Sequence, residues 1–164
     1  MEYVKIGKIV NTHGIKGELR IRSDFEYKDR VFKKGFILYI GNEKNKEEIN
    51  TYRHHKEFEM VTFIEYNNIN QVLKYLKEDV FINKDDLNLN SDEYLEEELI
   101  GFSVVENEQK VGEVIDITKT SPTNKIMEIT YNGKKVLLPY HKDFIQKLDL
   151  QNKKIEVKLI KGMI

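Results

Sequence analysis

The chain has 164 residues, and its 27 lysines and arginines nearly balance 28 aspartates and glutamates, which leaves a formal net charge of −1. This balance excludes the overall basicity typical of many nucleic-acid-binding domains, so a contact of that kind would have to rest on local patches. A hydrophobic fraction of 40% indicates a folded protein rather than a disordered tail, and the absence of cysteine excludes disulfides, zinc–thiolate sites and cysteine nucleophiles.

The first residues predict two half-buried strands, at 3–10 and 18–22. Apolar and charged side chains alternate in both, with Val4 and Ile6 facing one way in the first and Leu19 and Ile21 in the second. Residues 11–17, NTHGIKG, join the two strands, and the glycines in this segment permit a tight reversal of the backbone.

Three further strands are predicted before residue 65. Residues 36–40 form a continuous apolar run, which indicates a strand that is buried on both faces. The polar residues 41–48, GNEKNKEE, are expected to form a loop. Residues 49–53 and 58–64 are rich in β-forming side chains and flank HHKE, so they predict a hairpin.

Only residues 68–78 depart from the period of two. Apolar side chains recur at positions 69, 72, 73 and 76, which form one stripe at helical spacing, and Asn68 or Asn70 can cap the first turn. The segment predicts one short helix, followed by a strand at 80–82.

Residues 83–99 are polar and acidic and contain neither glycine nor proline, so they predict an ordered connection rather than a flexible spacer. The β pattern then returns, with strands expected at 100–106, 110–118, 126–131, 135–138 and 154–159. Asn132-Gly133 between two of these runs predicts a hairpin, and Pro139 is expected to end the strand before it. Residues 141–148 can form one helical turn.

These elements predict a mainly all-β protein with two small domains, at 1–88 and 99–164, joined by an acidic linker at 89–98. No apolar run reaches the roughly 20 residues needed to cross a membrane. Residues 1–10 also lack the features of a signal peptide. We therefore expect a cytoplasmic protein.

The sequence offers no support for catalysis or for a metal site. His54 and His55 are adjacent, so on a strand they point to opposite faces and cannot share an ion. The nucleophile elbow of hydrolases and the common glycine-rich phosphate-binding motifs are both missing. We expect no enzyme activity, no cofactor, no metal and no small-molecule substrate.

Four possible cations surround the first turn: His13, Lys16, Arg20 and Arg22. On an exposed edge they could neutralise RNA phosphates, which supply affinity without reading sequence. The alternative is a hairpin built on Gly14 and Gly17 whose solvent face happens to be charged, and the spacing alone favours this alternative. A second basic patch, Arg53, His54, His55 and Lys56, lies at the tip of the later hairpin, where a solvated loop is the simpler interpretation and RNA contact the other.

The boundary between the two halves combines an aromatic residue, a run of acids and an apolar block in residues 94–102, YLEEELIGF. One interpretation is an acidic linker whose apolar members fill the space between two domains. The other is a docking surface on which carboxylates attract a basic protein and aromatic side chains anchor it. Tyr140 is expected to pack on the rim of the second domain.

Four segments lie in the order GKIVNTHGIKGELRI at 7–21, VFINKDDL at 80–87, DEYLEEELIGFSVV at 92–105 and VLLPYHKDFIQKLDLQNKKIEVKLIKGMI at 136–164. Together they resemble the RimM family of ribosome maturation factors over nearly the whole chain. The first turn and the boundary segment are specific as a pair, whereas either motif alone would be weak.

The resemblance implies an N-terminal six-stranded barrel like the second domain of translation elongation factors, and a C-terminal barrel of the PRC type. It also implies a non-enzymatic assembly factor that binds ribosomal protein nineteen of the small subunit and helps the 30S head mature with its 16S rRNA. Tyr94 and Leu95 match a pair of aromatic residues in the family, so Leu95 keeps the apolar bulk but lacks a ring and a hydroxyl.

We expect protein binding at Tyr94, Leu95, Leu99, Ile100, Gly101, Phe102 and Tyr140. We expect rRNA contact at His13, Lys16, Arg20 and Arg22, around the structural glycines Gly14 and Gly17. A monomer without membrane association is expected. Two other functions are considered: a direct RNA-binding module of the translation-factor kind, with steep salt dependence, and, with least support, a barrel enzyme that uses a flavin or nucleotide.

Overall fold

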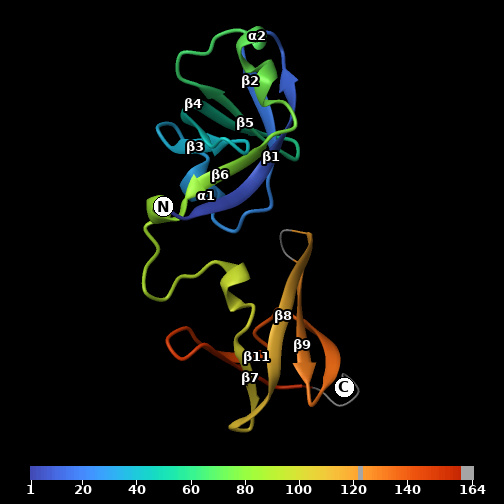
Figure 1. The fold of residues 1–164 in the computed structure, drawn as a ribbon. Helices are drawn as coiled ribbons and strands as arrows, with labels where there is room; N and C mark the ends of the chain where they lie inside the picture. The colour runs from blue at the N-terminus through green and yellow to red at the C-terminus, as the bar shows by residue number, and fades with distance from the viewer. Residues whose placement is uncertain (122–123, 160–164) are drawn as a thin grey trace. The chain divides into compact units, whose positions relative to one another are not determined.

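The computed structural model describes residues 1–121 and 124–159, and the chain divides into two compact units, Met1–Asn88 and Leu89–Ile164. Both units are built mainly of β-strands (Figure 1), which confirms the predicted fold class. Within the described residues, every helix is too short or too polar to span a lipid bilayer.

The first unit is a closed six-stranded barrel in the order β1-β2-β5-β4-β3-β6. Its strands are β1 (Tyr3–His13), β2 (Glu18–Arg22), β3 (Ile37–Ile40), β4 (Asn45–His55), β5 (Phe58–Phe63) and β6 (Asp79–Asn83). The pairings between neighbours are antiparallel. Strands distant in sequence therefore become neighbours, as β2 and β5 do.

Alternating side chains build the core of this barrel. Leu19 and Ile21 of β2 are fully buried, whereas Arg20 between them points away from the core. In β3, the successive residues Leu38 and Tyr39 are both buried, so this strand is covered on both faces, as its continuous apolar run predicts.

The prediction of a loop at 41–48 is wrong for residues 45–48. A turn covers residues 41–44, and β4 already begins at Asn45 and pairs with β3. Most side chains in this part of β4 are exposed, so the sequence carries no apolar alternation that would mark a strand.

The expected helix at 68–78 is shorter in the structure. A single α-turn, α2 (Ile69–Val72), continues as the 3-10 turn η1 (Leu73–Tyr75). Asn68 caps it, as predicted, because its side-chain oxygen accepts a hydrogen bond from the backbone N–H of Asn70 at 2.9 Å. The structure also contains a short helix that was not predicted, α1 (Lys28–Val31), and the 3-10 turn η2 (Lys84–Leu87).

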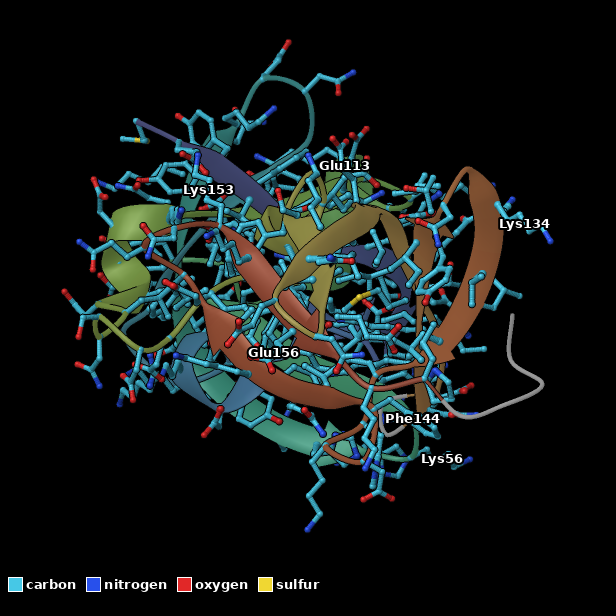
Figure 2. All side chains as sticks on the ribbon, turned by 90° about the horizontal axis from the view of Figure 1, so that it is seen from below. Lys56, Glu113, Lys134, Phe144, Lys153 and Glu156 are labelled. Atoms are coloured by element: carbon cyan, nitrogen blue, oxygen red, sulfur yellow. The ribbon has the colours of Figure 1, made fainter. Side chains whose placement is uncertain are left out.

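The second unit is a six-stranded sheet in the order β10-β9-β8-β7-β12-β11. Its elements are the 3-10 turn η3 (Glu96–Leu99) and the strands β7 (Ser103–Glu106), β8 (Gln109–Ser121), β9 (Asn124–Tyr131), β10 (Lys134–Pro139), β11 (Ile145–Asp149) and β12 (Lys154–Val157). The strands β12 and β7 are parallel, and the other pairs are antiparallel. The side chain of Lys134 projects from the start of β10 (Figure 2).

Two turn predictions in this unit have different outcomes. The hairpin at Asn132-Gly133 is confirmed, since both residues have positive φ, 49° and 85°, as a tight hairpin turn requires. The helical turn expected at 141–148 is confined to its first half, where the carbonyl of His141 accepts from the backbone N–H groups of Phe144 and Ile145, both at 2.9 Å. The second half forms β11, which was not predicted.

Candidate functional site

The segment at 94–102 belongs largely to the core of the second unit. Leu95, Leu99 and Phe102 are 1%, 0% and 6% exposed, so these three predicted binding residues are buried. Leu99 and Phe102 belong to the hydrophobic core of the second unit. Ile100, by contrast, is 45% exposed. Gly101 beside it has a φ of +94°, and its N–H donates to the carbonyl of Val114 at 2.8 Å. The turn therefore places Ile100 at the surface.

Tyr94 and Tyr140 meet although they lie far apart in sequence. Their hydroxyl groups form a hydrogen bond, and both rings are half-buried against the core of the second unit. The backbone N–H of Tyr140 donates to the carbonyl of Lys125 at 2.9 Å, and Nζ of Lys125 lies 5.9 Å from the centre of the Tyr140 ring. Both tyrosines are thus fixed in position with the hydroxyl ends together.

A pocket of about 230 Å³ opens beside this tyrosine pair. Its lining residues are Tyr94, Tyr140, His141, Lys142, Ile145, Gln146, Lys147 and Leu148. Most of them come from β11 and the turn before it, the region that sequence analysis interpreted as helical. We call this surface, formed by the eight lining residues, the tyrosine pocket.

The acidic run beside Tyr94 is divided by the fold. Glu96 is 7% exposed; one carboxylate oxygen lies 3.3 Å from Nζ of Lys119, and the other binds Nζ of Lys125. Its neighbour Glu97 is exposed, and so is Asp92. Glu96 is therefore part of a buried ion-pair network, whereas the exposed acids are available to attract a cationic partner.

On the first unit, cations from two segments of sequence share the outer face of β2, β5 and β4. Arg20 pairs directly with Met60, and Met60 pairs on its other side with Arg53. Directly paired residues project to the same face of a sheet, and Arg20 points away from the core between Leu19 and Ile21. Met60 is nevertheless fully buried, with an arginine on either side of it.

His13 and His55 belong to the same face. Nη2 of Arg20 donates to Nδ1 of His13 at 2.6 Å, and the ring centroids of the two histidines are 6.0 Å apart. Since a guanidinium can only donate, Nδ1 of His13 accepts this hydrogen bond. Partial desolvation, together with the positive charges of Arg53 and Lys56, lowers the pKa of His55 below its ordinary value.

Phe58 completes this face, although sequence analysis did not single it out. The guanidinium carbons of Arg20 and Arg22 lie 5.7 and 5.5 Å from the centre of its ring. Nη2 of Arg22 also lies 3.5 Å from a carboxylate oxygen of Glu57. The available sequence signal is the position of Phe58 directly after the basic hairpin tip. We call the surface formed by His13, Arg20, Arg22, Arg53, His55 and Phe58 the basic face.

The second basic patch of the sequence is split between two faces. Arg53 and His55 lie on the basic face, whereas Nδ1 of His54 is 3.1 Å from both carboxylate oxygens of Glu59, a residue that is 2% exposed.

Among the described residues, no three His, Cys, Asp or Glu side chains are grouped closely enough to hold a metal ion.

Lys16 lies in the turn between β1 and β2, beside an open hollow of about 430 Å³. The hollow is lined mainly by apolar atoms of His13, Gly14, Ile15, Lys16, Glu18 and Thr62. Ile15 is 75% exposed, but its carbonyl accepts a hydrogen bond from the N–H of Ile69 at 2.8 Å, which anchors the turn to α2. Gly17 has a φ of +92°, and a Cβ there would approach the backbone of Asn68 to 3.4 Å.

Comparison with known proteins gives two family matches. The model of the RimM N-terminal domain matches residues 4–87, and that of the RimM PRC barrel domain matches residues 96–163. The chain is 35% identical to the ribosome maturation factor RimM of Exiguobacterium sp., over 100% of this chain and 98% of the relative. It is 37% identical to the ribosome maturation factor RimM of Ligilactobacillus salivarius, over 99% of each chain.

Among solved structures, the N-terminal domain of RimM from Thermus thermophilus aligns with a TM-score of 0.45 at 20% identity, over 53% of this chain and 95% of that one. The two sequence relatives match over at least 98% of their length, and the two domain models follow one another in the order of the two structural units. The protein thus has a role in ribosome assembly, and the chain belongs to the RimM family of ribosome maturation factors.

Proposed function

We propose that this protein assists assembly of the small ribosomal subunit by binding, without catalysing a reaction. In this proposal the second unit holds ribosomal protein nineteen of the small subunit while the 30S head and its 16S rRNA mature. The protein acts in the cytoplasm, where bacterial ribosomes are assembled.

The observation that carries this proposal is the tyrosine pair beside a pocket. Tyr94 and Tyr140 present two half-buried rings with their hydroxyl groups together, next to the apolar side chains of Ile145 and Leu148. Aromatic side chains with a polar tip, held rigidly at a concave surface, are typical anchors of protein interfaces. A partner side chain that enters the tyrosine pocket gains apolar contact and hydrogen-bonding groups at the rim.

The exposed acids of the segment that contains Tyr94 support a basic partner, whereas the tyrosine pocket itself also has Lys142 and Lys147 in its lining. Ribosomal proteins are generally cationic because they bind rRNA, and exposed carboxylates such as Asp92 and Glu97 lie in the same segment as Tyr94. These groups can accelerate encounter and orient the partner, whereas the rings supply most of the binding free energy. The buried Leu95 retains the apolar character of its position, because it is 1% exposed.

The direct test is calorimetric titration of the full chain with purified ribosomal protein nineteen. The proposal predicts saturable binding at micromolar concentrations or below. A 16S rRNA fragment that contains the binding site of ribosomal protein nineteen should displace this chain from that protein. An assembly chaperone releases its partner when the partner's final contacts with rRNA form. Absence of heat and of saturation at micromolar concentrations would refute the proposal.

Direct RNA binding by the first unit is a second candidate function, favoured by one observation: two basic segments distant in sequence meet on the basic face. Filter binding of isolated 16S rRNA fragments over a salt series tests it. Each phosphate contact contributes about 0.7 to 0.9 to the slope of log affinity against log salt concentration. Arg22→Gln should reduce the slope by the amount expected for about one phosphate contact. Arg30→Gln should leave the slope unchanged, because the guanidinium of Arg30 lies against Tyr27.

A further inference from the structure

The basic face combines excess positive charge with half-buried rings. The permanent cations on or beside it are Lys16, Arg20, Arg22, Arg53 and Lys56, and the carboxylates that pair with them are Glu18 and Glu57. Lys56 extends from the turn between β4 and β5 at the surface (Figure 2). Cations therefore remain in excess after both ion pairs are formed, and a polyanion is the ligand that this surface fits.

The hollow beside Ile15 adds a site of different chemistry. It is open, has a volume of about 430 Å³ and is lined mainly by apolar atoms. His13 belongs both to the lining of the hollow and to the basic face. A flat apolar ring that enters the hollow would thus remain attached to a phosphate on the neighbouring cations.

We propose that the basic face binds a single-stranded stretch of RNA, with phosphates held by Arg20 and Arg22 and one unstacked base placed in the hollow beside Ile15. The inference rests on the RNA-binding function proposed above and specifies its ligand.

Preference for a single strand follows from the geometry of the surface. A duplex presents phosphates but keeps its bases stacked and paired, so it can use the cations and not the hollow. A single strand can turn a base outward onto ring and apolar surfaces, as in other proteins that combine a cationic track with stacking side chains. Ile15, the turn and the cations together therefore distinguish the two forms of RNA.

Fluorescence anisotropy with the full chain tests strand preference. One probe is a labelled unstructured RNA of about 12 nucleotides, a length that matches known single-strand binding sites. The other is a labelled hairpin duplex of equal charge. The single strand should bind more tightly, and Ile15→Ser should weaken it about fivefold while duplex binding is unchanged. Ile115→Ser is the matched control, because Ile115 is 44% exposed on β8 of the other unit.

Inorganic phosphate added at constant ionic strength should displace little RNA, because it cannot occupy the hollow.

The outcomes separate the inference from the function on which it rests. Failure to bind either RNA refutes the RNA-binding candidate itself. Equal binding of duplex and single strand, no effect of Ile15→Ser, or full displacement by free phosphate refutes the single-strand site while RNA binding stands. Thermal unfolding of each variant verifies that the fold is retained.

Discussion

Arg53 on β4 reaches over β5 to Glu18 on β2 and holds its carboxylate with two hydrogen bonds. Nε lies 2.9 Å from Oε2 and Nη2 lies 2.7 Å from Oε1, which is the two-pronged geometry that guanidinium and carboxylate groups favour. Strands β2 and β4 are not neighbours in the barrel. The pair therefore ties three strands together on the basic face and limits the charge that Arg53 can offer to a ligand.

Glu18→Gln tests what this pair contributes to stability. The pKa of Glu18 lies below its ordinary value of 4.5, first of all because of the hydrogen bond from Arg53, against the opposing effect of burial. A carboxylate with a lowered pKa in the folded state stabilises the protein at pH above its unfolded value, and this contribution is lost as the pH falls through the folded value. Urea denaturation should show a cost of about 1 kcal/mol at neutral pH, because Arg53 is half exposed, and this cost should decrease steadily as the pH is lowered below 4.5.

The matched control for this measurement is Glu57→Gln. Glu57 and Arg22 form an ion pair between exposed side chains, 70% and 61% accessible, which should contribute little. A cost of Glu18→Gln that is the same at neutral and acidic pH would contradict the electrostatic explanation and assign the effect to packing.

Glu96→Gln should destabilise the second unit at neutral pH. The carboxylate is held by Lys119 and Lys125, whose side chains are only 18% and 21% exposed, so its neutralisation leaves two partly buried ammonium groups without their counter-charge. We expect a loss of about 2 kcal/mol in the free energy of unfolding, measured by urea denaturation. Glu97→Gln, at the exposed neighbouring position, should change it by less than about 0.5 kcal/mol. Equal effects of the two variants would contradict the buried network.

Local patterns in the sequence predict much of this fold. Alternation identifies β2 with its observed bounds, the Asn132-Gly133 pair identifies the hairpin between β9 and β10, and the asparagine at 68 identifies a helix cap. The first half of β4 is not predicted because most of its side chains are exposed and show no apolar alternation. The strand β11 is not predicted because Ile145 and Leu148 are three residues apart, which is a helical spacing. This segment forms a strand because it pairs with β12.

The candidate sites depend on strand order, which local patterns do not contain. Each basic segment is visible in the sequence, but their union on one face requires that β5 lie between β2 and β4. The bond between the hydroxyls of Tyr94 and Tyr140 joins residues 46 positions apart and likewise requires the tertiary fold. Burial of Leu95, Leu99 and Phe102 is a further result of packing, since exposed and buried apolar residues look alike in a run such as LIGF.

Gly112→Ala should destabilise the second unit strongly. A Cβ at this position on β8 would lie 1.7 Å from the carbonyl oxygen of Thr130, so the backbones of β8 and β9 would have to separate. A Cβ at Gly101 would have no other atom within 4 Å. Gly101→Ala should therefore lower the free energy of unfolding by only about 1 kcal/mol, because alanine is strained at the positive φ of 94°. Thermal unfolding followed by circular dichroism should show a loss at least about twice as large for Gly112→Ala. The opposite order would contradict the close approach of the two strands.

Tyr94→Ala and Tyr140→Ala should each weaken binding of ribosomal protein nineteen by about 2 kcal/mol, since each removes a half-buried ring from the tyrosine pocket. Tyr94→Phe and Tyr140→Phe retain the ring and lose the bond between the hydroxyls, so a smaller loss of about fivefold is expected. Tyr131→Phe is the matched control: its hydroxyl binds Glu106, outside the tyrosine pocket, and the variant should bind normally. Calorimetric titration gives the affinities, and thermal unfolding gives the stability of each variant. If the alanine variants bind normally and only melt at lower temperature, the two tyrosines serve packing within the second unit, and the partner must be held elsewhere.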